Sequence, residues 1–247
     1  MEQAGVDKAV LVAVSHHDEY LNHALATYPS RFAGVAVNHP DAPDPVADLH
    51  RRVETMGIQG LRVFSLGDPT IAPESQPLFP LLTAMAELGV KLWFYAEVAQ
   101  VALLDRTLDL LPKLAVVMNH LGFCPSIWDE MRVDEHGRPR FDVTLPPASL
   151  DTVVGLARHP NVYVHMSGQY AFSQTPYPYL DLRPVVEQVY RAFGANRMMW
   201  ASDYPWIESE PGYGETLALV DHHLPGITPD ERLAIRGGTA AGLFRFD

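Results

Sequence analysis

The chain has 247 residues, of which 47% are hydrophobic and 19% are charged, so it holds enough apolar material for a large core. Its formal net charge of -12 argues against a nucleic-acid partner, because phosphate binding needs clustered lysine and arginine. A small anionic substrate needs only local arginines and is therefore still compatible with this charge. The single cysteine, Cys124, excludes an intramolecular disulfide. We find neither an apolar run of about 18 residues, the length of a membrane span, nor a signal-like N-terminus. We expect a cytoplasmic globular protein that does not bind membranes.

Short apolar runs recur along the chain, and helical patterns fill most of the intervals between them. Nearly continuous apolar runs are typical of parallel strands, which are buried on both faces. The predicted strands are 9–14, 34–39, 60–64, 90–95, 114–120, 162–166 and 197–201. The predicted helices are 18–28, 45–56, 77–88, 98–111, 149–158 and 183–193, with Gly57, Gly89 and Gly194 as C-cap signals after three of them.

Seven strand–helix units predict an α/β fold of the (β/α)8 TIM-barrel type in which one strand, the first, is missing. The rival is a doubly wound open sheet, but no Gly-x-Gly-x-x-Gly follows the first strand to support a nucleotide-binding version. The longer interval at about 122–147 contains a turn sequence, 134–139, and predicts an inserted loop or small hairpin. We expect one domain over residues 1–247.

Polar side chains gather where the predicted strands end, and in a barrel these ends form the functional rim. Histidine, carboxylate and arginine on one rim suit hydrolysis, which needs a base for water, a group that polarises a carbonyl and a cation for an anionic substrate. The strand-end residues are His16, His17, Asn38, His39, Arg62, Tyr95, Glu97, His120, His165, Ser167 and Asp203.

Some of these residues have an ordinary structural explanation. His16 and His17 precede a helix and are expected to cap it, and His39 is expected to make local hydrogen bonds. His165 stands next to last in its strand and could point inward or outward. Trp206 is expected to pack and to wall a pocket.

Three residues favour a functional interpretation. Asp203 follows a buried strand, where a carboxylate must be solvated, paired or metal-bound. His120 ends an apolar run and would leave its ring at the rim. Arg62 lies within a strand, where a buried guanidinium needs a specific partner.

Six motifs in chain order resemble one known family. They are residues 5–12, 31–34, 57–62, 119–122, 161–168 and 200–206, the last reading Trp-Ala-Ser-Asp-Tyr-Pro-Trp. Together they resemble the amidohydrolase-2 branch of the amidohydrolase superfamily. That branch includes enzymes like 2-pyrone-4,6-dicarboxylate lactonase and sulfomuconolactone hydrolase, and the aminocarboxymuconate semialdehyde decarboxylase group.

The resemblance implies an enzyme that hydrolyses a small lactone or related carboxylated compound, or a metal-dependent decarboxylase of the same branch. Asp203 would activate the attacking water or bind a metal, and His120 would bind that metal or polarise the carbonyl. Arg62 would meet a substrate carboxylate. Further substrate-binding candidates on this rim are His165, Tyr95 and Trp206.

The sequence departs from the family pattern at its beginning, because it has no His-x-His. The family carries this motif on its first strand, so two expected ligands for a divalent metal, zinc or manganese, are missing, and a metal-free enzyme becomes an alternative. We expect that the chain is a truncated form. A further alternative is a non-catalytic remnant that binds a ligand or partner. The expected assembly is a homodimer, because it is the common assembly of soluble enzymes.

Overall fold

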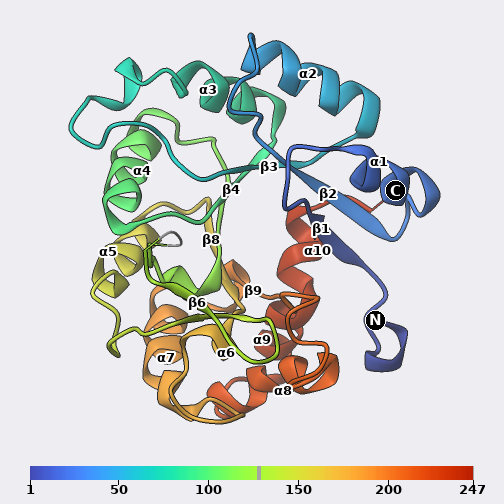
Figure 1. Cartoon of the computed structure of the whole chain (residues 1–247), viewed down its shortest axis with the longest axis vertical. Coiled ribbons are helices and arrows are strands. Elements are labelled where there is room, and N and C mark those ends of the chain that lie inside the picture. The colour runs from blue at the N-terminus through green and yellow to red at the C-terminus, as the bar shows by residue number, and fades with distance from the viewer. Residues whose placement is uncertain (127–128, 247) are drawn as a thin grey trace. The chain divides into compact units, whose positions relative to one another are not determined.

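The computed structural model describes residues 1–126 and 129–246, which divide into two units (Figure 1). Unit 1 comprises Met1–Phe94, Ala99–Val117 and the residues from Ala241 onward, and unit 2 comprises Tyr95–Val98 and Met118–Ala240. None of the helices among the described residues has both the length and the apolar character needed to cross a bilayer.

Unit 1 is built on parallel strands that pair in chain order. β1 (Ala9–Val12), β2 (Phe32–Val37), β3 (Gly60–Val63) and β4 (Lys91–Phe94) lie side by side, and β5 (Val116–Met118) follows. Helices α1 (Glu19–Thr27), α2 (Pro45–Met56), α3 (Phe79–Leu88) and α4 (Val98–Leu110) connect them. This alternation of strand and helix is the crossover pattern that parallel pairing requires.

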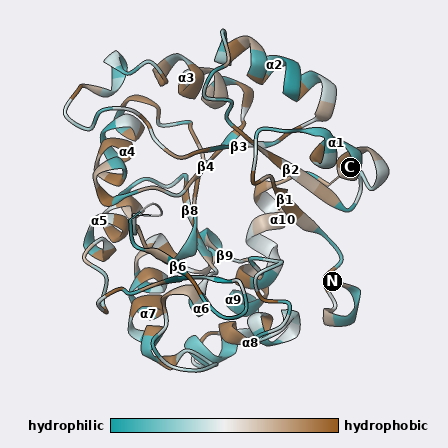
Figure 2. Cartoon of the chain, viewed as in Figure 1, coloured by the Kyte–Doolittle hydropathy of each residue, from teal (hydrophilic) through white to brown (hydrophobic). Residues whose placement is uncertain are grey.

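Helix α2 shows how the local sequence sets these boundaries. The Asp44 side chain accepts a hydrogen bond from the backbone N–H of Ala47 at 2.9 Å, and Pro45 occupies the first turn, where its missing N–H costs nothing. Figure 2 shows hydrophilic and hydrophobic turns alternating on this helix, in contrast with the mainly hydrophobic α3. The buried face of α2 includes Leu49 and a guanidinium, that of Arg52, which pairs with Asp18 at 2.8 Å.

Unit 2 holds a parallel pair and an antiparallel hairpin. β8 (Val162–Met166) pairs with β9 (Met198–Trp200), and β6 (Met131–Val133) pairs with β7 (Pro139–Phe141). Its helices are α5 (Leu150–Gly155), α6 (Gln169–Phe172), α7 (Arg183–Phe193), α8 (Tyr213–His223) and α9 (Pro229–Leu233), and α10 (Thr239–Leu243) begins in unit 2 and continues into unit 1 from Ala241. Short 3-10 turns cover Glu2–Ala4, Pro73–Ser75, His120–Gly122, Leu156–Arg158, Leu180–Leu182 and Ala195–Arg197, and Ala234–Gly238 forms a π-turn.

The predicted elements are present with small shifts at their ends. Each predicted strand and helix has a counterpart, and the predicted insertion contains a true hairpin, β6–β7. The helix predicted at 149–158 is α-helical only to Gly155 and ends in a 3-10 turn. Gly57 and Gly89 end their helices in the left-handed conformation, whereas Gly194 has a different backbone geometry. The single-domain organisation stays a prediction.

Candidate active site

Asp203 lies in unit 2, three residues after β9, on a backbone held at a φ of 59°. This left-handed conformation is uncommon for residues other than glycine, although aspartate tolerates it better than most. The side chain is partly exposed, and its Oδ2 accepts a hydrogen bond of 2.8 Å from the Tyr170 hydroxyl. A buried strand therefore presents a carboxylate whose orientation is fixed by a neighbouring phenol.

Tyr170 belongs to the short helix α6 and is 2% exposed. Burial raises the pKa of its hydroxyl well above the usual value, and the negative charge of Asp203 raises it further. The phenol is therefore protonated across the working range of an enzyme and acts only as a donor toward the carboxylate.

His120 lies two residues after β5, in a turn where it and Leu121 both have positive φ values, 53° and 56°. Its Nδ1 is 3.0 Å from the Ser167 hydroxyl, and its ring meets the edge of Tyr95 with centroids 4.8 Å apart. The residue is partly exposed. These contacts hold one face and one nitrogen of the imidazole in place.

His165 is the buried neighbour of this group, with 5% exposure. Its Nδ1 lies 3.1 Å from the side-chain oxygen of Asn119, so the ring nitrogen donates there. Burial lowers the pKa of His165 to about 3, with a smaller effect from the charge of His120. The ring is thus neutral at physiological pH, and it lies in a buried position.

The segment from Ser167 to Phe172 joins these side chains. Ser167 contacts His120, Tyr170 binds Asp203, and the Phe172 ring lies 6.1 Å from the His120 ring. The segment can turn this tightly because Gly168 has a φ of 72°, and a Cβ there would lie 2.5 Å from His120 Nδ1. One six-residue segment therefore positions both predicted catalytic residues.

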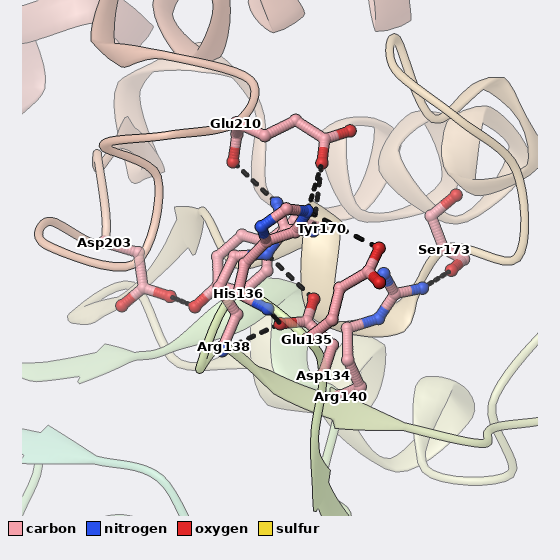
Figure 3. Close-up of polar contacts among 9 residues, drawn as sticks. All are labelled: Asp134, Glu135, His136, Arg138, Arg140, Tyr170, Ser173, Asp203 and Glu210. Atoms are coloured by element: carbon pink, nitrogen blue, oxygen red, sulfur yellow. Dashed lines mark hydrogen bonds and ion pairs between the residues drawn. The ribbon is translucent and has the colours of Figure 1, made fainter.

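Arg138, in the β6–β7 hairpin, supports Tyr170 from the other side. It is 5% exposed, and its guanidinium carbon lies 5.8 Å from the centre of the Tyr170 ring (Figure 3). Its Nε donates to Asp134 at 2.9 Å, and its two terminal nitrogens donate to the backbone oxygen and carboxylate of Glu210 at 2.7 and 3.1 Å. The buried charge is thus fully paired.

The sequence interpretation missed this support. Tyr170 lies close enough to a predicted strand end to have been a candidate, since Ser167 was included on that ground. Arg138 carries no such signal, because its contacts with Tyr170 and with Glu210 join parts of the chain that are remote in sequence.

An open depression of about 500 Å³ lies on the outer side of this arginine. Two arginines of the hairpin, Arg138 and Arg140, line it together with Tyr179 and Glu210. Arg140 donates to the backbone oxygen of Ser173 at 2.9 Å. Its lining therefore contains both positively and negatively charged side chains.

Of the other predicted residues, one lies beside Asp203 and one belongs to unit 1. Trp206 follows Asp203 in the same loop and is 42% exposed. Arg62 belongs to unit 1, where its guanidinium lies 4.7 Å from the Phe64 ring centre. Its role toward a substrate stays a prediction.

The strand-end histidines of unit 1 form a cluster of their own. The His16 ring lies 4.5 Å from that of His17 and 4.4 Å from that of His39. Helix α1 begins at Glu19 after Asp18, and neither His16 nor His17 makes the cap bond to it, so their expected capping role is wrong.

The donor set expected for a metal is not assembled. Within residues 1–126 and 129–246, no group of three or more histidine, cysteine, aspartate and glutamate side chains could hold an ion. His120 is engaged by Ser167, and Asp203 by Tyr170. These residues do not fit a metal centre, so we derive no chemical step through one, and their metal-binding role stays a prediction.

Comparison with known proteins places this chain among related sequences and folds. The model of the amidohydrolase family matches residues 1–246. An L-fucono-1,5-lactonase of Burkholderia ambifaria is 36% identical over 98 residues, which are 37% of this chain and 33% of that protein. The aligned part thus spans about one third of the length of this curated relative.

Solved structures agree with the fold. A candidate 2-pyrone-4,6-dicarboxylic acid hydrolase of Pseudomonas putida has a TM-score of 0.72 and 26% identity, covering 98% of this chain and 83% of that one. An amidohydrolase of Burkholderia multivorans solved with bound zinc has a TM-score of 0.75 and 19% identity, covering 98% and 84%. The predicted fold class, parallel α/β of the TIM-barrel type, is confirmed.

Proposed function

Since the chain belongs to the amidohydrolase family, we propose that it is an enzyme that hydrolyses a small lactone by attack of water on the ring carbonyl. The family assignment confirms the resemblance carried by the six sequence motifs. The lactonase of B. ambifaria and the pyrone hydrolase candidate of P. putida both act, by their names, on lactone rings, which supports this substrate class.

The proposal rests on one observation, the different contacts of the two oxygens of the Asp203 carboxylate. Its Oδ2 is held by Tyr170, whereas no hydrogen-bond donor in the described part of the chain contacts Oδ1. A partly exposed carboxylate with one fixed and one available oxygen suits a general base, which must keep its orientation while it receives a proton from water.

The reaction then requires four events at this group. Asp203 Oδ1 takes a proton from water, the resulting hydroxide bonds to the lactone carbonyl carbon, and collapse of the adduct breaks the ring carbon–oxygen bond. The leaving oxygen receives the proton that Asp203 took from water, which gives the open hydroxy acid and restores the carboxylate. The tetrahedral adduct bears negative charge on the former carbonyl oxygen, so a nearby donor lowers the barrier.

His120 is the donor that we assign to this charge. When the Ser167 hydroxyl donates to Nδ1, the neutral imidazole carries its proton on Nε2. Nε2 can then donate to the carbonyl oxygen and its developing charge. Tyr95 packs edge-on against the ring and keeps it from rotating away.

The test is hydrolysis of two lactones by the purified chain and by Asp203→Asn. L-fucono-1,5-lactone and 2-pyrone-4,6-dicarboxylate represent a neutral and an anionic ring, and acid release with a pH indicator reports opening. We expect turnover of at least one ring and a loss of about 1,000-fold in D203N, the middle of the range for a general base. Asp142→Asn is the matched control, because that carboxylate is 78% exposed and, among the described residues, pairs only with Arg132.

Retention of the rate in D203N would contradict this assignment. Release of carbon dioxide from an aromatic or unsaturated acid, without acid release from either lactone, would instead favour the decarboxylase alternative. Absence of any turnover together with ligand binding would favour the non-catalytic alternative.

A further inference from the structure

We propose that the inserted β6–β7 hairpin sets the orientation of Asp203, with Tyr170 as the positioning residue and Arg138 as the side chain that holds Tyr170. This inference rests on the proposed function, because it assigns to the hairpin a part in the work of the general base. None of these residues except Asp203 belongs to the motifs that identify the family.

The first link is the hydrogen bond from the Tyr170 hydroxyl to Asp203 Oδ2. A neutral donor bound to an ionised acceptor makes one of the stronger protein hydrogen bonds, and it favours the charged carboxylate. Because Oδ2 is engaged, rotation of the carboxyl group is restricted, and Oδ1 is the oxygen left to receive a proton from water.

The second link is the contact of Arg138 with the Tyr170 ring. A guanidinium at 5.8 Å from the ring centre is within cation–π range, and both side chains are almost completely buried. The positive charge of Arg138 also lowers the pKa of the Tyr170 hydroxyl, against the larger effect of burial, and a more acidic hydroxyl is a stronger donor. Arg138 therefore fixes the ring and improves the bond that the ring makes.

The third link ties the hairpin to the loop that carries Asp203. Arg138 pairs with Asp134 in its own hairpin turn and with Glu210, which follows Asp203 in the loop after β9 (Figure 3). The loop is thus held at Asp203 by Tyr170 and at Glu210 by Arg138. If the hairpin detached, Arg138 would keep Asp134 but lose both hydrogen bonds to Glu210 and its contact with the Tyr170 ring.

The first arm of the experiment is Tyr170→Phe, which removes one oxygen and keeps the ring. We expect kcat for the lactone to fall by about 10- to 100-fold, the cost of a misplaced catalytic group, with KM changed less than about twofold.

Tyr190→Phe is the matched control for this arm. The Tyr190 hydroxyl also donates to a carboxylate, that of Glu231 at 2.6 Å, but between α7 and α9. Loss of a tyrosine–carboxylate bond is therefore common to both variants, and only Y170F should lower kcat. Equal kcat values in Y170F and wild type would overturn the proposal.

The second arm is Arg138→Met, with Arg132→Met as control in the same hairpin. Arg132 is 61% exposed and pairs with Asp142, so R132M removes an arginine without touching Tyr170. We expect R138M to lower kcat in the same direction as Y170F, and R132M to leave it unchanged. Glu210→Gln is a milder variant that weakens one partner of Arg138, and it serves if R138M does not fold.

A crystal structure of each folded variant separates this inference from the proposed function. In R138M or E210Q, we expect the Tyr170–Asp203 hydrogen bond to lengthen or break, which is measurable even if neither lactone is a substrate. An unchanged bond would overturn the role of the hairpin. Loss of activity in D203N alone, with Y170F fully active, would leave the general base in place and overturn the positioning role.

Discussion

Gly168 offers the sharpest test of how the site is assembled. Its backbone φ is 72°, and an added Cβ would lie 2.5 Å from His120 Nδ1, 3.0 Å from Cγ and 3.2 Å from Cε1. Because all three atoms belong to one ring, the contacts created by Gly168→Ala cannot be relieved by moving the flexible end of a side chain. The imidazole itself must move away from Ser167.

The expected loss of unfolding free energy in G168A has two parts. An alanine in the left-handed region costs about 1 to 2 kcal/mol of folding free energy, and overpacking of a tight contact costs about 1 to 3 kcal/mol. We therefore expect G168A to lose about 2 to 5 kcal/mol of unfolding free energy, the sum of these two ranges. Because the His120 ring is displaced from its hydrogen bond, kcat should also fall by about 100-fold.

Gly57→Ala is the control that separates the two parts. Gly57 follows α2 with a φ of 66°, and among the described residues nothing lies within 4 Å of its added Cβ. G57A therefore shares the backbone strain but not the contact with His120. Urea denaturation gives the difference in stability, and lactone hydrolysis gives kcat. Equal stability and kcat in the two variants would refute the claim that Gly168 makes room for His120.

Two further predictions concern buried ionisable groups. The pKa of His165 is lowered to about 3 and that of His223 to about 4, in both cases chiefly by burial, from an ordinary value of 6.5. Below pH 6.5 the unfolded chain therefore binds more protons than the folded one, so the stability of the wild type should fall as pH decreases from 6.5 toward 3. In thermal melts over this range, the melting temperature of His223→Gln should decrease less than that of the wild type. A pH-independent melting temperature across this range in the wild type would contradict this. Burial also raises the pKa of Cys124 to about 12, so iodoacetamide at pH 8 should label it only after denaturation in urea, and rapid labelling of the native protein would show the thiol to be accessible.

The strands were predictable because their burial leaves a mark in the sequence. The run that becomes β8 has mainly apolar residues, and Val162, Val164 and Met166 are completely buried. Strand ends then locate candidate residues, which is how Asp203 and His120 were identified. The reasoning works because a parallel strand has one functional end, and any polar side chain there needs an explanation.

What the sequence could not provide is the set of partners that surround those residues. Whether His165 points inward depends on Asn119, which lies 46 positions earlier in the chain. Local spacing carries no information about such pairs, since the strand period gives only the face and not what lies opposite. The position of the inserted hairpin was predictable from its turn residues, but its contact with Tyr170 was not.

This difference explains why the family motifs can be recognised in the sequence, whereas the supporting contacts cannot. Asp203 and His120 sit on strand-end turns whose backbone conformations are unusual in themselves, with positive φ values at both residues. Such positions restrict which residues can occupy them, so they produce recognisable motifs. Arg138 makes its contacts from an insertion whose backbone imposes little on the sequence, and its role depends on Asp134, Glu210 and Tyr170 being present together. Relatives that share the motifs but differ in this insertion would therefore have to orient their carboxylate by other contacts.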